Sequence, residues 1–187
     1  MKLKSLCHKP DFNELNIDLN TPDNDHELTF RNEITGDDPV KILEVIESTS
    51  VFSQEEKNIA IELTDERLKR GVQSGYHFLF CERYGKMVGY ACFGKIAGTM
   101  SSFDLYWIAV HKDFHNSGIG KALLRKSESI ISEMGGDHIY IETSSRKSYE
   151  AARLFYSHCG YKKEAILKDF YSTGDNKVIY VKKIKKR

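Results

Sequence analysis

The chain contains 187 residues, and its 28 lysines and arginines nearly balance its 27 aspartates and glutamates, which leaves a net charge of +1 at pH 7. This length suits one domain with a sizeable core rather than two domains. The balanced charge creates no overall field that would attract nucleic acid. The cysteines are scattered without a C-x-x-C pair, and no segment approaches the ~18 apolar residues of a membrane span. We therefore expect a soluble, cytoplasmic protein with reduced thiols and with no membrane or nucleic-acid partner.

The first half of the chain predicts a polar extension, two helices and a hairpin. Asp38, followed by Pro39, has the pattern of a helix cap, and Ser53 and Glu56 have the spacing of a capping box. Gly85 marks the turn of the hairpin. In chain order, we expect the extension at 1–27, a strand at 28–34, a helix that ends at Ser48, a helix that ends near Arg70, and strands at 76–81 and 87–93.

The second half alternates strands and helices. In chain order, we expect a strand at 101–110, a helix at 118–134, a strand at 138–143, a helix from a cap at Ser148 to Gly160, and a hairpin of strands at 161–170 and 178–183. This order predicts an α+β fold with a central mixed, mostly antiparallel sheet flanked by helices. One β–α–β crossover passes through the helix at 118–134.

The central strand gives way to a helix in the sequence VHKDFHNSGIGKALL, where one residue separates Gly118 from Gly120. At such a junction the free backbone N–H groups and the helix dipole favour an anion, and glycine lets a phosphate approach the main chain. The segment is not a P-loop, because His115 and Ala122 stand where that motif needs Gly and Ser or Thr. Leu123 replaces the third glycine of a dinucleotide fingerprint. The sequence therefore indicates a pyrophosphate held by main chain, with a plain glycine-rich turn as the alternative.

Two blocks of the chain resemble the GNAT superfamily of acyl-CoA-dependent N-acetyltransferases. The segment around Gly118 and Gly120 is similar to the family's motif A, Gln/Arg-x-x-Gly-x-Gly/Ala, with His115 at the Gln/Arg position. The block YEAARLFYSHCGY is similar to motif B, with Tyr149 where Asn is common. The resemblance implies that residues 28–187 form a GNAT acetyltransferase domain with acetyl-CoA as the acyl donor.

The resemblance also implies where the donor binds. Backbone N–H groups at the end of the central strand would polarise the thioester carbonyl and bind the pantetheine, and the glycine loop would hold the pyrophosphate. These residues are Ile108, Ala109 and Val110 on the strand, and His115, Asn116, Ser117, Gly118, Ile119, Gly120 and Lys121 in the loop. His111 and His115 flank the loop, but no third ligand is near in sequence, so we expect no metal.

Transfer of an acyl group to an amine needs a base for the ammonium and an acid for the leaving thiolate. Asp104 is the leading candidate base, because histone-acetylating members of the family carry a catalytic Glu at this place. On a regular strand it shares a face with Tyr106, Ile108 and Val110. Glu142 is the competing base, and a water relay could involve both carboxylates. Tyr156 aligns with the motif B tyrosine that protonates the thiolate, with a role in the core as its alternative.

The segment DFYSTGDN joins the last two strands, which border the acceptor site in this family. Asp169, Tyr171 and Asp175 are candidates to recognise an amino-bearing acceptor, although the same residues suit an ordinary hairpin turn. We therefore expect an N-acetyltransferase in which a primary amine of a small molecule, peptide or protein attacks acetyl-CoA directly in a ternary complex. The alternative is a catalytically inactive acyl-CoA-binding sensor or regulatory module. A homodimer stays open, and the basic end at 182–187 is expected to be a solvated tail.

Overall fold

The computed structural model describes residues 28–185; the extension predicted at 1–27 and residues 186 and 187 of the basic end lie outside the described residues. Within that range no helix has the length and apolarity needed to cross a membrane. The helices are α1 (Asp38–Thr49), α2 (Gln54–Arg70), α3 (Ile119–Glu133) and α4 (Glu150–His158), with 3₁₀ turns η2 (Gly71–Ser74), η3 (Lys112–Phe114) and η4 (Lys147–Tyr149). The strands are β1 (Leu28–Arg31), β2 (His77–Arg83), β3 (Lys86–Lys95), β4 (Ser102–Val110), β5 (His138–Ser144), β6 (Lys162–Ser172) and β7 (Asp175–Lys183).

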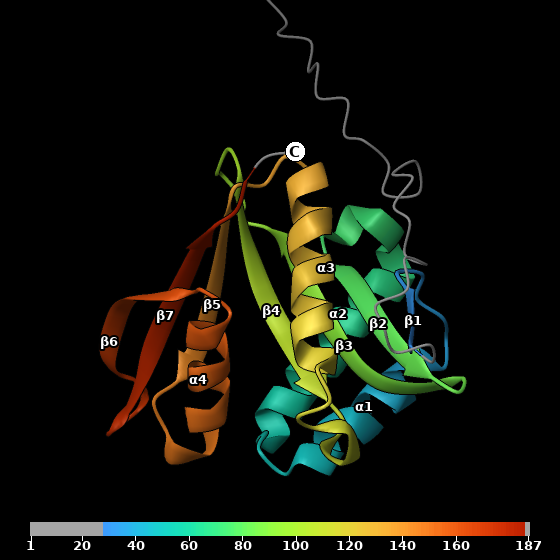
Figure 1. Ribbon diagram of the computed structural model, residues 1–187, viewed down its shortest axis with the longest axis horizontal. Helices are drawn as coiled ribbons and strands as arrows, with labels where there is room; N and C mark the ends of the chain where they lie inside the picture. The colour runs from blue at the N-terminus through green and yellow to red at the C-terminus, as the bar shows by residue number, and fades with distance from the viewer. Residues whose placement is uncertain (1–27, 186–187) are drawn as a thin grey trace, which may run out of the picture.

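A single sheet in the order β1-β2-β3-β4-β5-β7-β6 forms the centre of the molecule (Figure 1). Its neighbouring strands are antiparallel except for β4 and β5, which run parallel and are connected through α3. The predicted mixed sheet with one crossover is therefore confirmed.

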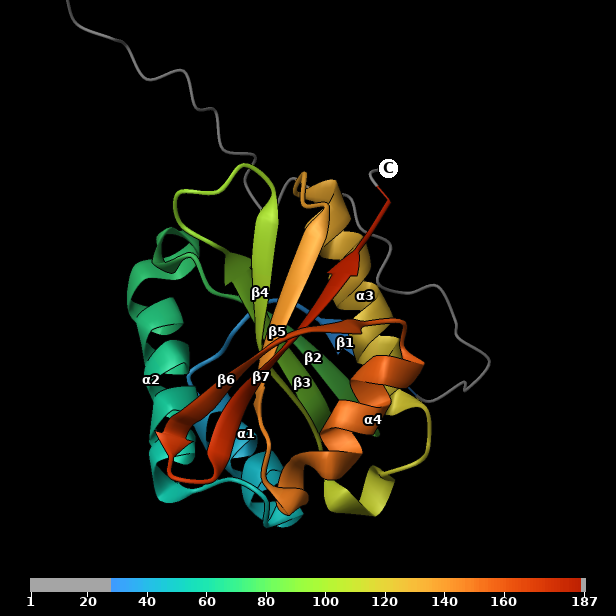
Figure 2. The ribbon, with the colours of Figure 1, turned by 90° about the vertical axis from the view of Figure 1, so that its left-hand side faces the viewer.

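Helices cover both faces of this sheet (Figure 2). On one face α1 and α2 pack over a buried cluster that includes Ile42, Phe78 and Phe80. On the other face α3, with α4 beside it, packs over a cluster that includes Leu123 and Phe103. Apolar burial on both sides makes the sheet a rigid frame for the groups at its centre.

β4 and β5 stay paired over only three residues, from Ser102 with His138 to Asp104 with Tyr140. Beyond this point β5 continues beside β7 as far as Ser144, and β4 continues beside β3, so the two strands diverge (Figure 1). The sheet therefore opens at its centre, and the remainder of β4 has one edge without a neighbouring strand in the described part of the chain.

Two predicted helix starts are wrong. Asp37, not Asp38, occupies the N-cap position of α1, and its side chain makes no capping hydrogen bond; the buried carboxylate of Asp38 forms an ion pair with Arg31 at 2.6 Å. Ser148 does not cap α4; it lies inside the turn η4, and α4 begins after Tyr149. The capping box predicted for α2 is confirmed. A short polar residue near a helix start thus marks the region of the start but not its register, since its side chain can bond elsewhere.

Candidate active site

The open edge of β4 presents backbone groups to the gap between β4 and β5. His111 N–H donates to Val88 O at 2.8 Å, so His111 faces β3. Backbone groups alternate between the edges of an antiparallel strand, so Ala109 also faces β3, whereas Ile108 and Val110 face the gap. The three predicted residues therefore differ. The N–H groups of Ile108 and Val110 point into the opening, whereas that of Ala109 points toward β3.

The glycine loop ends at the start of α3 with an uncapped helix terminus. Gly118 is the N-cap residue with φ of +87°, and no side chain of the described range caps this helix. A Cβ on Gly118 would meet nothing within 4 Å, so glycine is required by the backbone conformation and the space beside it is open. The first intrahelical bond joins Ala122 N–H to Gly118 O at 3.0 Å, which leaves the N–H groups of residues 119–121 without partners in the helix.

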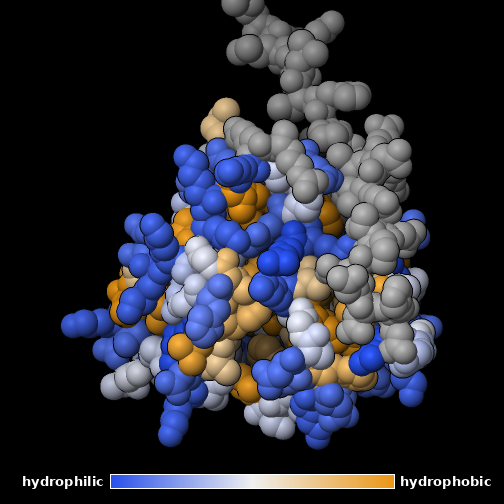
Figure 3. Space-filling model, viewed as in Figure 1, coloured by the Kyte–Doolittle hydropathy of each residue, from blue (hydrophilic) through white to orange (hydrophobic). Residues whose placement is uncertain are grey.

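The side chains of the loop hold the loop in shape. His115 Nε2 lies 2.9 Å from Val110 O, and Ser117 Oγ donates to Phe114 O at 2.6 Å. Asn116 adopts a left-handed conformation with φ of +61°. Lys121 is exposed at the first turn of α3. A hollow bordered by both apolar and hydrophilic residues is visible on the face of the molecule drawn in Figure 3.

Asp104 lies at the point where β4 and β5 separate. Its carboxylate makes no hydrogen bond or ion pair with any residue between 28 and 185. Burial raises the pKa of Asp104 to about 6, the negative charge of Glu142 adds to this rise, and the positive charge of Lys177 opposes it. A half-buried carboxylate with this pKa is ionised at neutral pH and is placed to accept a proton.

A β-bulge in β4 places Asp104 and the last residues of the strand on opposite faces of the sheet. Two consecutive residues of β3 pair with Leu105 and Trp107, so Tyr106 between them is an extra residue. As a result Leu105 and Ile108 both pack toward α3, while Trp107 packs toward α1 and α2. The expectation that Asp104 shares its face with every second residue up to the end of the strand is therefore wrong. Asp104 points toward the α1 and α2 face, opposite to Ile108.

Glu142, the competing base, is held in an ion pair. Lys177 Nζ lies 2.5 Å from Glu142 Oε2, and the Lys177 side chain is 12% exposed while that of Glu142 is 49% exposed. The Glu142 carboxylate is therefore already engaged by a cation, whereas that of Asp104 has no ion-pair partner in the described range.

Tyr156 lies on the buried side of α4. It is 8% exposed, and its ring lies 6.3 Å from that of Tyr161 and 5.9 Å from that of Tyr180. Desolvation raises the pKa of Tyr156 well above its ordinary value, so the phenol is neutral at physiological pH. The neutral phenol still carries the proton that an acid must donate. The same aromatic packing also fits the alternative, in which Tyr156 is a core residue.

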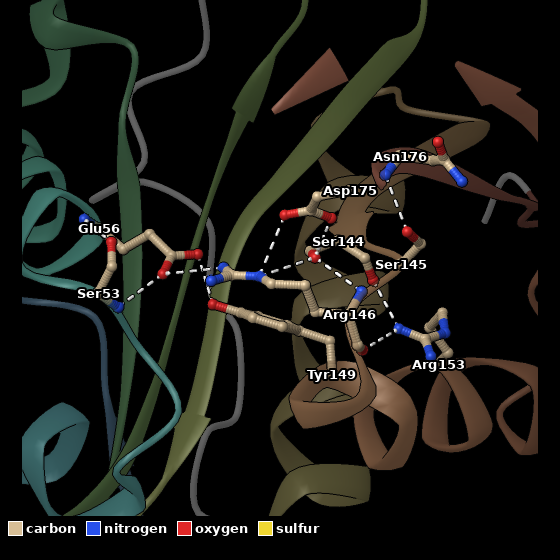
Figure 4. Close-up of polar contacts among 9 residues, drawn as sticks. All are labelled: Ser53, Glu56, Ser144, Ser145, Arg146, Tyr149, Arg153, Asp175 and Asn176. Carbon is tan, nitrogen blue, oxygen red and sulfur yellow. Dashed lines mark hydrogen bonds and ion pairs between the residues drawn. The ribbon is translucent and has the colours of Figure 1, made fainter. Parts of the chain in front are cut away.

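A polar network closes one end of the opening (Figure 4). Glu56, the capping-box carboxylate of α2, accepts a hydrogen bond from the Tyr149 hydroxyl and lies 3.8 Å from Arg146. Arg146 Nε lies 3.1 Å from Asp175 Oδ2, and Ser144 Oγ donates to Asp175 Oδ1 at 2.5 Å. The network joins α2 to the end of β5 and the start of β7, and it fixes the position of each.

The three predicted acceptor residues have different environments. Asp175 is buried in the network just described, and Asp169 Oδ1 accepts from Gly174 N–H at 2.6 Å within the hairpin. Tyr171 is 48% exposed, and desolvation, with help from Glu142, raises its pKa to about 12. Asp169 thus holds the hairpin backbone in place, Asp175 bonds to the side chains of Ser144 and Arg146, and Tyr171 presents its side chain to solvent.

Sequence reasoning did not single out Lys177, Arg146 or Glu56 as parts of this region. The one available signal for Lys177 was a lysine at the start of a strand that is otherwise apolar, NKVIYV. Within residues 28–185 no three His, Cys, Asp or Glu side chains gather in a way that could hold a metal ion.

Comparison with known proteins identifies the family. A family model described as an acetyltransferase (GNAT) domain matches residues 74–163. A solved structure from Desulfovibrio desulfuricans, assigned to the GNAT family of acetyltransferases, is 40% identical, has a TM-score of 0.81, and aligns over 83% of this chain and 98% of its own. An uncharacterized N-acetyltransferase of Methanocaldococcus jannaschii is 32% identical over 108 residues, and the match spans 57% of this chain and 65% of that relative. A GNAT family acetyltransferase of Elizabethkingia anophelis with acetyl-CoA bound shares the fold, at 16% identity and a TM-score of 0.62 over 85% of this chain and 99% of its own. This chain therefore belongs to the GNAT family of acetyltransferases.

Proposed function

We propose that this protein is an N-acetyltransferase that moves the acetyl group of acetyl-CoA to a primary amine by direct attack in a ternary complex. The observation that carries the proposal is the unpaired carboxylate of Asp104 at the point where β4 and β5 separate. Membership of the GNAT family supports it, as does the acetyl-CoA bound to the relative from Elizabethkingia anophelis.

The donor would lie along the gap between the two strands. The uncapped N–H groups at the start of α3 and the open space at Gly118 suit a pyrophosphate. The edge of β4 would pair with the amide groups of the pantetheine through Ile108 and Val110, and one of these N–H groups would stabilise the oxyanion that forms on the thioester.

The reaction then needs three proton transfers. Asp104 takes a proton from the acceptor ammonium, directly or through water, and the free amine attacks the thioester carbon. The C–N bond forms as the C–S bond breaks, and Tyr156 donates its proton to the leaving thiolate. The attacking nitrogen loses its second proton to water, and the Tyr156 phenolate regains a proton from water. Tyr171 would contact the acceptor, while Asp169 and Asp175 shape the hairpin beside it.

A coenzyme A release assay over a panel of amines tests this function. The panel contains diamines and polyamines, amino acids, aminoglycosides, peptides with a free N-terminus and lysine peptides, and calorimetry first measures binding of acetyl-CoA. With a good acceptor, Asp104→Asn should lose rate near neutral pH and recover part of it as the pH rises, because the fraction of free amine then grows without help. Glu164→Gln, which changes an exposed carboxylate on β6, is the matched control.

Two results would overturn the proposal. Failure of the folded protein to bind acetyl-CoA at millimolar concentration would remove the donor altogether. Tight binding without transfer to any amine of the panel would favour the inactive acyl-CoA-binding module instead.

A further inference from the structure

Two carboxylates face the opening between β4 and β5, and a single lysine lies close to both. Lys177 forms the ion pair with Glu142, and its charge also acts on Asp104. We propose that Lys177 is a positioning residue that assigns the role of base to Asp104, because it holds Glu142 in an ion pair and offsets the repulsion between the two carboxylates. This inference rests on the proposed function, since it concerns the same site.

The surroundings of Lys177 fix its ammonium group in one place. Lys177 lies on β7 opposite Ser144, and Glu142 on β5 is two residues from that pair, which makes Lys177 and Glu142 diagonal neighbours in the ladder. The Lys177 ammonium also lies 3.7 Å from the centroid of the Phe170 ring on β6. The carboxylate and the aromatic face thus both contact a side chain that is only 12% exposed. A cation with so little contact with water needs such partners, and it has little freedom to leave them.

Other charged and titratable groups lie around this pair, and most of them are engaged elsewhere. Glu56, Arg146 and Asp175 bond to one another or to their neighbours in the network at the end of the opening. The remaining groups are phenols, which carry no charge in their protonated form. These groups include Tyr76 before β2, Tyr106 on β4, Tyr140 opposite Asp104 on β5, Tyr171 on β6, Asp175 on β7, Glu56 on α2 and Arg146 before η4. Glu142 and Lys177 are therefore the charges that decide how Asp104 titrates.

The pair has a chemical consequence. Without the cation, the negative charge of Glu142 would raise the pKa of Asp104 further. With Lys177 in place, the Glu142 carboxylate is engaged in the ion pair, and Asp104 is the group left to accept a proton from the substrate.

Titration of Asp104 by NMR in the free protein tests this assignment without any substrate. Aspartate labelled with ¹³C at the carboxyl carbon gives the signal, and Asp104→Asn identifies it. Lys177→Met should raise the pKa of Asp104 by about one pH unit, the lower end of the effect of a nearby opposite charge. Glu142→Gln should shift it downward, and the double variant should lie between the two. Lys177→Arg should restore the wild-type value, and Lys163→Met, which changes an exposed lysine on β6, should leave it unchanged.

The kinetics provide an independent measure once an acceptor is known. The acid limb of kcat/KM against pH should move to higher pH in Lys177→Met and should return in Lys177→Arg. A purely structural role for Lys177 would lower the rate without moving that limb.

The outcomes separate this inference from the proposed function. A folded Lys177→Met in which Asp104 titrates as in the wild type, or at lower pH, overturns the role of Lys177 even if the enzyme is active. The predicted shifts in a protein that acetylates no amine would uphold the ion-pair assignment and refute the proposed function. If Lys177→Met does not fold, the role of Lys177 is decided by two other measurements. The pKa of Asp104 should rise in Lys177→Gln and should fall in Glu142→Gln.

Discussion

Asp104→Asn should make the protein more stable at neutral pH while it lowers the rate of transfer. The carboxylate is half-buried and has no partner in the described range, so its ionised form is less favourable in the folded protein than in the unfolded chain. Its pKa is raised from 3.8 to about 6, which by about 1.4 kcal/mol per unit corresponds to roughly 3 kcal/mol. Because the group is also half exposed, screening by solvent reduces this to about 1–2 kcal/mol.

The sign of the pH dependence follows from linkage. When folding raises the pKa of an acid, the folded state binds the proton more tightly than the unfolded chain does. The protein therefore has its full stability below the pKa of the unfolded chain, and it loses stability as the pH rises through the pKa of the folded state. Asparagine carries no charge, so the variant loses no unfolding free energy at this position over the same pH range. The difference in unfolding free energy between Asp104→Asn and wild type should therefore widen from about pH 4 to pH 7 and stay constant above it.

Urea unfolding followed by circular dichroism at a series of pH values measures this difference. The slope of free energy against urea should be unchanged, so that the midpoints report stability. Glu164→Gln, an exposed position on β6, should show no such widening. A difference that is constant with pH, or an Asp104→Asn protein that is less stable than wild type at pH 8, would show that the native fold compensates the charge and would refute the reasoning.

Three further substitutions address the rest of the site. Gly118→Asp should abolish most coenzyme A binding in calorimetry, because it places a side chain and a negative charge at a residue with φ of +87°. The control is Gly98→Asp, at a residue with φ of +78° in open space, which should strain the backbone similarly but leave the affinity for coenzyme A unchanged. Tyr156→Phe should retain affinity for coenzyme A but lower kcat by roughly 10²- to 10⁴-fold. If the chemical step limits the rate, unchanged turnover in steady-state kinetics would exclude Tyr156 as the acid. Glu142→Gln should lose less rate near neutral pH than Asp104→Asn, and the reverse order in parallel pH–rate profiles would transfer the role of base to Glu142.

The sequence was most informative where a local rule governs the structure. Gly118 could be recognised because two glycines at a junction between strand and helix leave the main chain open, and the structure places Gly118 directly before α3 with φ of +87° and open space beside it. The crossover from β4 through α3 to β5 followed from the change of hydrophobic period from two to 3.6. These features depend on neighbours in the chain, so one sequence was sufficient to find them.

The site geometry depends on contacts that the chain order does not reveal. The extra residue at Tyr106 leaves β4 looking like a regular strand in sequence, yet it reverses the face on which later side chains lie. The contact between Glu56 and Tyr149 joins residues 93 positions apart, and that between Glu142 and Lys177 depends on the register of β5 with β7. Such pairings arise from tertiary structure, which is why Asp104 could be named from the sequence but the cation near it could not.

The early separation of β4 from β5 also bears on how the protein avoids self-association. An exposed row of unpaired backbone groups is normally a template for another strand, and proteins protect such edges. Here the open edge of β4 lies in the middle of the sheet, with helices over both faces and β5 diverging from it (Figure 1). A strand inserted between two others needs about 4.8 Å on each side, which is not available close to the point where β4 and β5 separate. Close to that point the edge is therefore closed to a second polypeptide strand, and this part of β4 can keep unpaired peptide groups in the sheet without the aggregation that such groups usually invite.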